Sequence, residues 1–202
     1  MKPTVLSLCD ESGVMVQPWA DAGYGCVCVD LLRRDGTVGP VVHVQADVRD
    51  YMPDFDPHII FAFPPCTHTA VSGARWFKAK GPAAAAEAFS VLAGCLRIIE
   101  SFDCPWMVEN PVSTFSTYWR KPDLVVHPWQ FGDGYDKATC LWTGGGFIAP
   151  EPTVTERPAD TDQRIHRMPP GPDRQRLRSQ TPAGFARAVF AANAGRLVPC
   201  PA

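Results

Sequence analysis

The sequence predicts an α/β fold: one domain built on a mostly parallel, twisted sheet with helices on both faces. Apolar, strand-like runs alternate with segments of helical periodicity along most of the chain, which is the pattern of doubly wound folds. A length of 202 residues, 46% of them apolar, suits one well-packed core and leaves little for a second domain. We therefore treat residues 1–202 as a single domain.

The chain opens with a strand, loop, helix and second strand, a unit of Rossmann type. Residues 4–8 form a short apolar strand, and the helical pattern that follows ends at Gly23, a residue type that tolerates the backbone of a helix terminus. Trp19 in this helix is expected in the core rather than in a cofactor wall. The second strand, residues 26–30, ends in Asp30, where nucleotide-binding sheets accept ribose hydroxyls; a turn or capping acid is the alternative.

The later elements continue the alternation. Residues 82–102 form the clearest helix, because Pro82 suits its first turn and apolar residues recur at helical spacing. Residues 106–111 read as a buried strand with a polar end, and residues 182–193 as the last helix. Two further strands are expected, at residues 41–44 and 58–63.

Charge and cysteine content exclude several classes of protein. A formal net charge of −2 and a pI near 6.2 give no global basic signature, so any nucleic-acid surface must be local. The eight cysteines show no metal-ligand spacing, so we expect no metal, and most should fill the core. Cys26 and Cys28 should point the same way from their strand. With no secretory leader and no apolar run of about 18 residues, we expect a cytoplasmic protein with reduced thiols and no membrane contact.

One cysteine lies where chemistry is expected. The strand at residues 58–63 must end at Pro64, which puts Cys66 just outside its carboxyl end, where open α/β sheets place their ligand crevices. A small buried hydrophobe is the competing interpretation of a free cysteine. His68 follows two residues later and is a candidate for proton transfer, because imidazole titrates near neutrality; a loop histidine that contacts solvent or phosphate is the alternative.

Three motifs follow one another along the chain: the opening unit that ends in Asp30, then Pro64-Pro65-Cys66, then Glu109-Asn110-Pro111. Together they resemble the cytosine-5 DNA methyltransferase family, and the resemblance covers residues 3–142 and 178–193. It implies a Rossmann-like class I methyltransferase fold with S-adenosyl-L-methionine as the donor and DNA as the substrate. In this family the Pro-Cys loop supplies a nucleophile and the Glu-Asn dipeptide an acid.

The chemistry explains why these residue types belong together. Carbon 5 of cytosine is too weakly nucleophilic to attack a methyl donor until a thiolate adds to carbon 6. Cys66 is the expected attacking group, and Glu109 would hydrogen-bond ring nitrogen 3 and the exocyclic amine. Asn110 would support the loop, and a nearby base must later remove the carbon 5 proton.

The resemblance also implies binding residues. On the donor side, Asp30 would meet the ribose and Asp47 the adenine amine, and the other candidates are Asp10, Glu11, Ser12, Gly13 and Pro64. On the substrate side the candidates are Ser72 and Arg75 in a loop that closes over a flipped base, Lys137 and Thr139 on a later strand, and Arg178 near the tail.

The loop after the first strand departs from the family pattern. The family has an aromatic residue and two closely spaced glycines there, where this chain has Cys9-Asp10-Glu11-Ser12-Gly13. Glycines let the backbone approach a cofactor, whereas acids could pair with a sulfonium or exclude it. Two alternatives therefore stand beside methylation: hydroxymethyl transfer from 5,10-methylenetetrahydrofolate by the same cysteine, and a catalytically inactive relative that binds DNA.

A Pro- and Arg-rich segment, residues 147–178, stands in place of the family's long target-recognition region. Residues 157–187 hold seven arginines and three aspartates. A solvated loop is the simpler interpretation, and a contact surface for DNA phosphates is the sharper one. The sequence thus predicts a minimal, phage-type enzyme, monomeric and active on DNA in the cytoplasm of a bacterial host.

Overall fold

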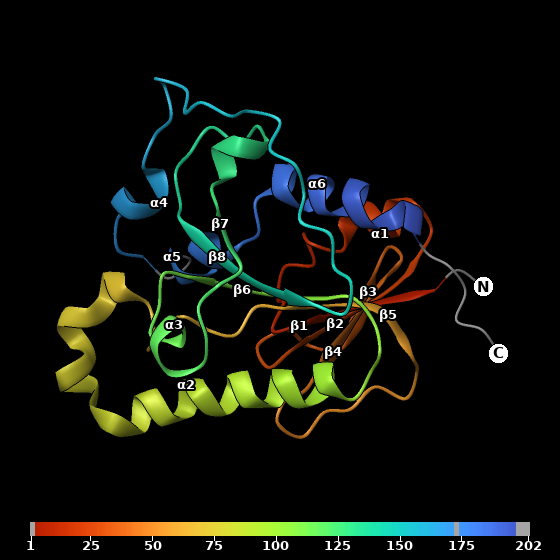
Figure 1. The fold of residues 1–202 in the computed structure, drawn as a ribbon. Coiled ribbons are helices and arrows are strands. Elements are labelled where there is room, and N and C mark those ends of the chain that lie inside the picture. The colour runs from red at the N-terminus through yellow and green to blue at the C-terminus, as the bar shows by residue number, and fades with distance from the viewer. Residues whose placement is uncertain (1–2, 172–173, 197–202) are drawn as a thin grey trace.

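The computed structural model describes residues 3–171 and 174–196, which form one mixed sheet with helices on both faces (Figure 1). Within this part of the chain the sheet has eight strands in the order β3-β4-β2-β1-β5-β6-β8-β7. Five neighbouring strands pair in parallel: β4 (Val41–Gln45), β2 (Gly25–Asp30), β1 (Thr4–Leu8), β5 (Pro57–Ala62) and β6 (Trp106–Pro111). The predicted mostly parallel α/β sheet is confirmed.

Antiparallel strands close both edges of the sheet. β3 (Gly36–Val38) pairs with β4 at one edge, while β8 (Thr139–Gly144) pairs with β6, and β7 (Leu124–Val126) pairs with β8 at the other. The sequence did not indicate β3, because its three residues are all exposed and show no alternation. The last strands of the sheet thus bring residues after 120 beside the end of β6.

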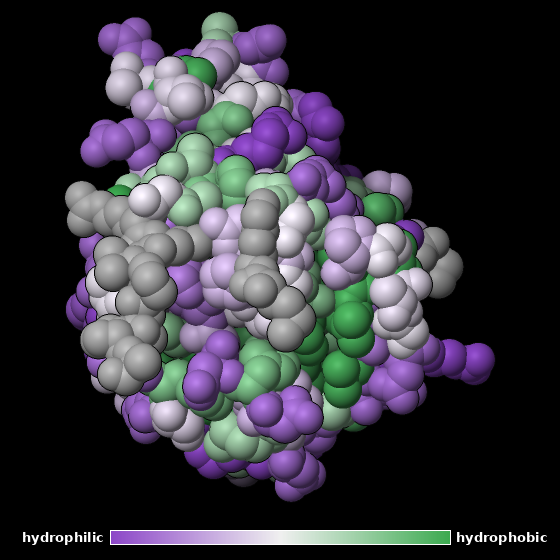
Figure 2. Space-filling model, turned by 90° about the vertical axis from the view of Figure 1, so that its right-hand side faces the viewer, coloured by the Kyte–Doolittle hydropathy of each residue, from purple (hydrophilic) through white to green (hydrophobic). Residues whose placement is uncertain are grey.

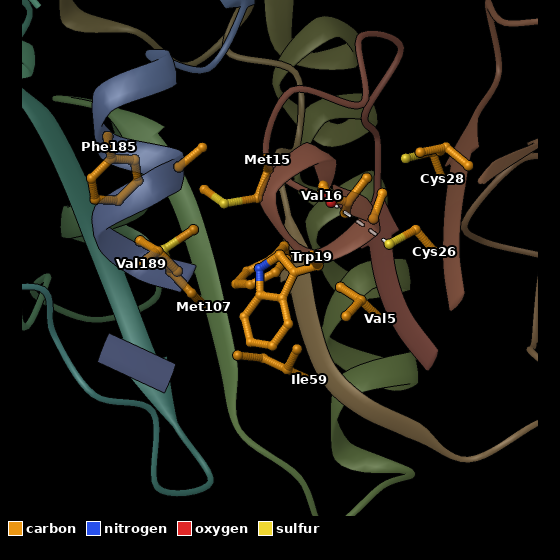
Figure 3. Close-up of a cluster of buried hydrophobic side chains, with 14 of the residues drawn as sticks. Val5, Met15, Val16, Trp19, Cys26, Cys28, Ile59, Met107, Phe185 and Val189 are labelled. Atoms are coloured by element: carbon orange, nitrogen blue, oxygen red, sulfur yellow. Dashed lines mark hydrogen bonds between the residues drawn. The ribbon is translucent and has the colours of Figure 1, made fainter. Parts of the chain in front are cut away.

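Helices α1 (Gln17–Asp21) and α6 (Ala183–Asn193) cover one face of the sheet (Figure 1). Trp19 is fully buried there, and its ring meets those of Tyr24 and Phe190 edge-on, with centroids 5.2 and 5.1 Å apart. Figure 3 shows Trp19 directed from α1 toward the strands. Cys26 and Cys28 lie in the same cluster. The predicted core position of Trp19 and the shared direction of the two cysteines are confirmed.

The opposite face is covered by α2 (Phe77–Glu100) and α3 (Phe115–Tyr118). The chain bends at Gly81, with φ 74° and ψ 177°, so the regular helix starts at Pro82 as predicted. The stretch Val71–Glu100, which includes the 3₁₀ helix η1 (Val71–Trp76), is long and apolar enough by composition to cross a membrane. Its buried residues, among them Leu92, pack on the sheet.

Short helices occupy the segments between and after the strands. These are η2 (Pro128–Phe131), α4 (Arg164–Arg167), α5 (Arg174–Ser179) and η3 (Ala194–Arg196). The seven cysteines in the described residues are free, and five of them are buried; Cys200 lies outside the described residues. Figure 2 shows the right-hand side of the view in Figure 1, where a strip of apolar residues lies among hydrophilic ones.

Helix α6 is fastened to the rest of the fold at both ends. At its start, the Gly184 N–H donates to the Asp133 carboxylate at 2.9 Å. At its end, the Asn193 side chain both donates to and accepts from the backbone of Ile148, each at 2.9 Å. These contacts hold α6 against the segments that follow β7 and β8.

The start of α6 leaves no room for a side chain. A Cβ added at Gly184 would lie 2.1 Å from the Phe131 carbonyl oxygen, a backbone atom that cannot move aside easily. We predict that Gly184→Ala lowers the free energy of unfolding by about 1–3 kcal/mol, because overpacking outweighs the better helix propensity of alanine. Urea unfolding measures this change. Gly73→Ala, with open space around it, is the matched control, and equal stabilities of the two variants would contradict the prediction.

Candidate functional site

The loop after β5 presents Cys66 at the carboxyl edge of the sheet. A tight turn follows it, because the N–H groups of Thr69 and Ala70 both donate to the Cys66 carbonyl, at 3.1 and 2.9 Å. The Asn110 amide on β6 donates to the Pro64 carbonyl at 2.7 Å. This hydrogen bond ties the cysteine loop to the neighbouring strand, which is the supporting position predicted for Asn110.

Glu109 lies on the opposite face of β6 from Asn110, because side chains alternate along a strand. Met107, two residues earlier, packs in the cluster beneath α6, so Glu109 shares that face. Its Oε1 is buried and accepts no hydrogen bond within the described residues. The nearest cation is the Lys137 ammonium, 3.8 Å away, and both side chains are only 12–13% exposed. A buried carboxylate oxygen without a donor is an open acceptor for a ligand.

Cys66 and Glu109 are electrostatically coupled. The pKa of the Cys66 thiol is raised above its ordinary value, first by burial and second by the negative charge of Glu109. The positive charges of Lys137 and Arg178 act in the opposite direction. The fold therefore brings together four predicted catalytic and substrate-binding residues from four separate regions of the sequence.

Glu109 also lines a pocket beneath the end of α6. Its polar lining comes from Glu109, His127, Lys137, Thr139 and Thr181, and its apolar lining from Val126, Pro128, Phe131, Pro182 and Phe185. Two predicted substrate residues, Lys137 and Thr139, thus face the same space as the predicted acid.

His127 in this pocket was not predicted from the sequence. Its Nδ1 lies 2.5 Å from the Asp136 carboxylate, and the other Asp136 oxygen pairs with the Arg157 guanidinium at 3.0 Å. The backbone N–H of His127 donates to the Gln130 side chain at 2.6 Å, which fixes the start of η2. No local pattern links a histidine to an aspartate nine residues later, so only the fold pairs them.

The remaining predicted catalytic and substrate-binding residues are His68, Ser72, Arg75 and Arg178. His68 has a buried Nδ1 and Arg178 a buried Nε, neither with a hydrogen-bond partner in the described residues. Ser72 and Arg75 are exposed on η1, and the Arg75 guanidinium lies over the Trp76 ring at 5.2 Å. Their substrate contacts stay predictions.

The donor-side loop closes on itself through Asp10. Its buried carboxylate accepts hydrogen bonds from the Ser7 hydroxyl, the Ser12 N–H and hydroxyl, and the Gly13 N–H, at 2.8–3.1 Å. Cys9 before it has φ 55° and Gly13 has φ 69°, both in the left-handed region that favours glycine. Asp10 thus stabilises a turn with left-handed backbone at Cys9 and Gly13, and both of its carboxylate oxygens accept hydrogen bonds from within the protein.

Two further acids, Glu11 and Asp30, lie close to Asp10. The pKa of Asp30 is raised, first by burial and then by the charges of Glu11 and Asp10, although the Leu32 N–H donates to its Oδ1 at 2.7 Å. Such crowded carboxylates fit hydroxyl donors or a cationic ligand, which suits a nucleoside-bearing sulfonium. Asp47, by contrast, is paired with the Arg49 guanidinium. The predicted adenine contact of Asp47 would require that pair to open.

No group of three or more His, Cys, Asp or Glu side chains able to hold a metal ion occurs in residues 3–171 and 174–196.

Comparison with known proteins identifies the fold. No protein-family model and no curated protein matches the chain. The structure resembles that of a protein provisionally assigned as a DNA modification methyltransferase encoded within a prophage of E. coli, with a TM-score of 0.51 and 14% identity. The match covers 71% of this chain but only 46% of that one. The fold is a Rossmann-like methyltransferase fold.

A second structure in the comparison is the glycopeptide N-methyltransferase MtfA, with 12% identity and a TM-score of 0.34. The match covers 71% of this chain and 66% of that chain. At this TM-score the likeness carries no argument about the present site.

The coupled charges around Cys66 predict the behaviour of its thiol. Removing the neighbouring anion in Glu109→Gln should lower the pKa of Cys66, and removing the cation in Lys137→Met should raise it. The pH dependence of iodoacetamide alkylation, followed at the Cys66 peptide by mass spectrometry, measures both shifts. Expected profiles move to lower pH for Glu109→Gln and to higher pH for Lys137→Met. Unchanged profiles would contradict the arrangement of charges.

Proposed function

We propose that this protein is a DNA cytosine-5 methyltransferase that uses Cys66 as its nucleophile. One observation carries the proposal: a partly buried thiol and a partly buried carboxylate, Cys66 and Glu109, lie at the carboxyl ends of adjacent parallel strands, and the charge of Glu109 raises the pKa of the thiol. The methyltransferase fold supports it, and so does the DNA-modifying assignment of the E. coli prophage protein.

The chain's own residues divide the work on the target base. Cys66 adds to carbon 6 as a thiolate, and Glu109, whose Oε1 is open, hydrogen-bonds nitrogen 3 and the exocyclic amine. Because burial and Glu109 raise the pKa of the thiol, a proton acceptor is needed, and His68 on the same loop takes that role. Asn110 keeps the loop at the end of β6 through its hydrogen bond to Pro64.

S-adenosyl-L-methionine, when bound, would supply an electrophilic methyl group to carbon 5. Asp30 and Glu11 would hold it, since their crowded charges suit ribose hydroxyls and a cation. Ser12 and Gly13 complete the turn that would face it, with Asp10 acting as the internal brace.

Basic elements flank Cys66 on two sides, and we assign them to the DNA backbone. Thr67, the next residue, accepts a hydrogen bond at its carbonyl from Lys80 of α2 at 2.5 Å, and its hydroxyl accepts one from Gln175 of α5 at 3.4 Å. Lys80 belongs to an exposed stretch, residues 71–80, that also carries Arg75 and a Trp76 ring 54% exposed. Figure 1 shows this stretch, α4 and α5 at the same end of the molecule.

The proposed substrate has a direct test. We predict that DNA containing 5-fluorocytosine forms a covalent adduct with the protein when S-adenosyl-L-methionine is present, because fluorine blocks the elimination that frees Cys66. Intact-protein mass spectrometry detects the adduct. Cys66→Ser should abolish it, while Cys104→Ser, a change at the other edge of the sheet, should not.

Two outcomes of this experiment would replace the proposal. An adduct that depends on 5,10-methylenetetrahydrofolate would make the reaction a hydroxymethyl transfer. Binding of the DNA without an adduct in the presence of either donor would leave a catalytically inactive DNA-binding protein.

The DNA-backbone surface predicts salt-dependent binding. Replacing one phosphate-contacting cation lowers the slope of log affinity against log salt by about 1 without changing sequence preference. We expect this of Arg75→Gln, on the exposed stretch, and of Arg167→Gln, on α4. Fluorescence anisotropy with labelled duplexes at several salt concentrations measures the slopes. Arg187→Gln, at an exposed position of α6, is the control; if all three variants keep the wild-type slope, the assigned surface is wrong.

A further inference from the structure

The pocket beside Glu109 contains a second acid–base group. His127 lines that pocket together with Glu109, Lys137, Thr139 and Thr181. Asp136 is outside the lining but fixes the imidazole through Nδ1 at 2.5 Å. The histidine side chain is 30% exposed and the aspartate 18%, so the pair is only partly shielded from water.

The hydrogen bond selects one form of the imidazole. A carboxylate only accepts hydrogen bonds, so Nδ1 must carry the proton that it donates to Asp136. Arg157 pairs with the other Asp136 oxygen at 3.0 Å. In neutral His127, Nε2 then carries a lone pair, and no hydrogen bond reaches it from residues 3–171 or 174–196.

The proposed reaction needs a base that its assigned residues do not supply. After Cys66 has added to carbon 6 and carbon 5 has gained its new substituent, the carbon 5 proton must leave. Glu109 is engaged with nitrogen 3 and the amine, and the Lys137 ammonium is a donor only. His68 is engaged with the thiol proton. Among the polar side chains of the pocket, His127 is the group with a free lone pair that can accept this proton.

We propose that His127 is the general base that removes the carbon 5 proton, and that Asp136 is its positioning residue. The inference rests on the proposed function and adds the residue that completes the reaction. In this step the C5–H bond breaks and Nε2 takes the proton. The electron pair of that bond forms the C5=C6 double bond, and the C6–S bond breaks to return the Cys66 thiolate. The imidazolium then releases its proton to water.

A donor-free exchange assay isolates the proton transfer. On DNA with [5-³H]cytosine, addition of Cys66 lets carbon 5 take a proton from water, and loss of the original label then releases tritium. We expect His127→Asn to lower tritium release at least about 100-fold, the usual worth of a general base. Asparagine keeps a donor to Asp136 but has no basic nitrogen. Asp136→Asn should also slow release, because an amide no longer enforces the imidazole form.

A second readout separates catalysis from folding. With S-adenosyl-L-methionine present, His127→Asn should still form the 5-fluorocytosine adduct at close to the wild-type rate, because that step loses no carbon 5 proton. On ordinary cytosine DNA the same variant should accumulate a covalent, methylated adduct that the wild-type protein does not. His58→Asn, at the start of β5 and the opposite edge of the sheet, should match the wild type in every assay.

Each contrary outcome has a distinct meaning. Tritium release by His127→Asn at the wild-type rate would overturn the assignment of His127. A parallel fall of exchange and of 5-fluorocytosine adduct would show a structural role and overturn it equally. A wild-type protein that forms no adduct would remove the proposed function, and this inference with it.

Discussion

The hydrogen bond from Asn110 to the Pro64 carbonyl organises the candidate site. It joins the loop after β5 to the end of β6 and so fixes the Cys66 loop relative to the strand that carries Glu109. Because side chains alternate along β6, using Asn110 on one face for this support leaves Glu109 on the other face. One strand end therefore both anchors the cysteine loop and presents the carboxylate to the pocket beneath α6.

Opposing charges around Cys66 act on the pKa of its thiol. Burial and the charge of Glu109 keep the Cys66 thiol protonated, while Lys137 and Arg178 partly offset them. A thiol in this state is protected from adventitious oxidation, since the thiolate is the reactive form. Reaction then depends on groups that manage protons, which gives His68 and the His127–Asp136 pair their place in the proposed mechanism.

The donor side shows how a turn can be kept without its usual glycines. Cys9 and Gly13 adopt left-handed backbone, and the Asp10 carboxylate satisfies the donors of the loop between them. The Asp10 carboxylate therefore acts within the loop, and Glu11 and Asp30 carry the neighbouring negative charges that the proposed cofactor would meet. Asp10 and Glu11, which replace the expected glycines, thus differ in position: the Asp10 carboxylate is hydrogen-bonded within the loop, and Glu11 is not part of that network.

The sequence alone determined the five parallel strands, helix α1, the two longest helices α2 and α6, the buried Trp19, and the placement of Cys66 and Glu109 at strand ends, because periodicity and proline are local signals. Only the tertiary structure decided what surrounds them. The edge strand β3, the pairing of Asp47 with Arg49, and the His127–Asp136 pair had no local signature. Sheet order and antiparallel pairing set those neighbours, since β8 and β7 fold back beside β6 and carry Lys137 and His127 to Glu109.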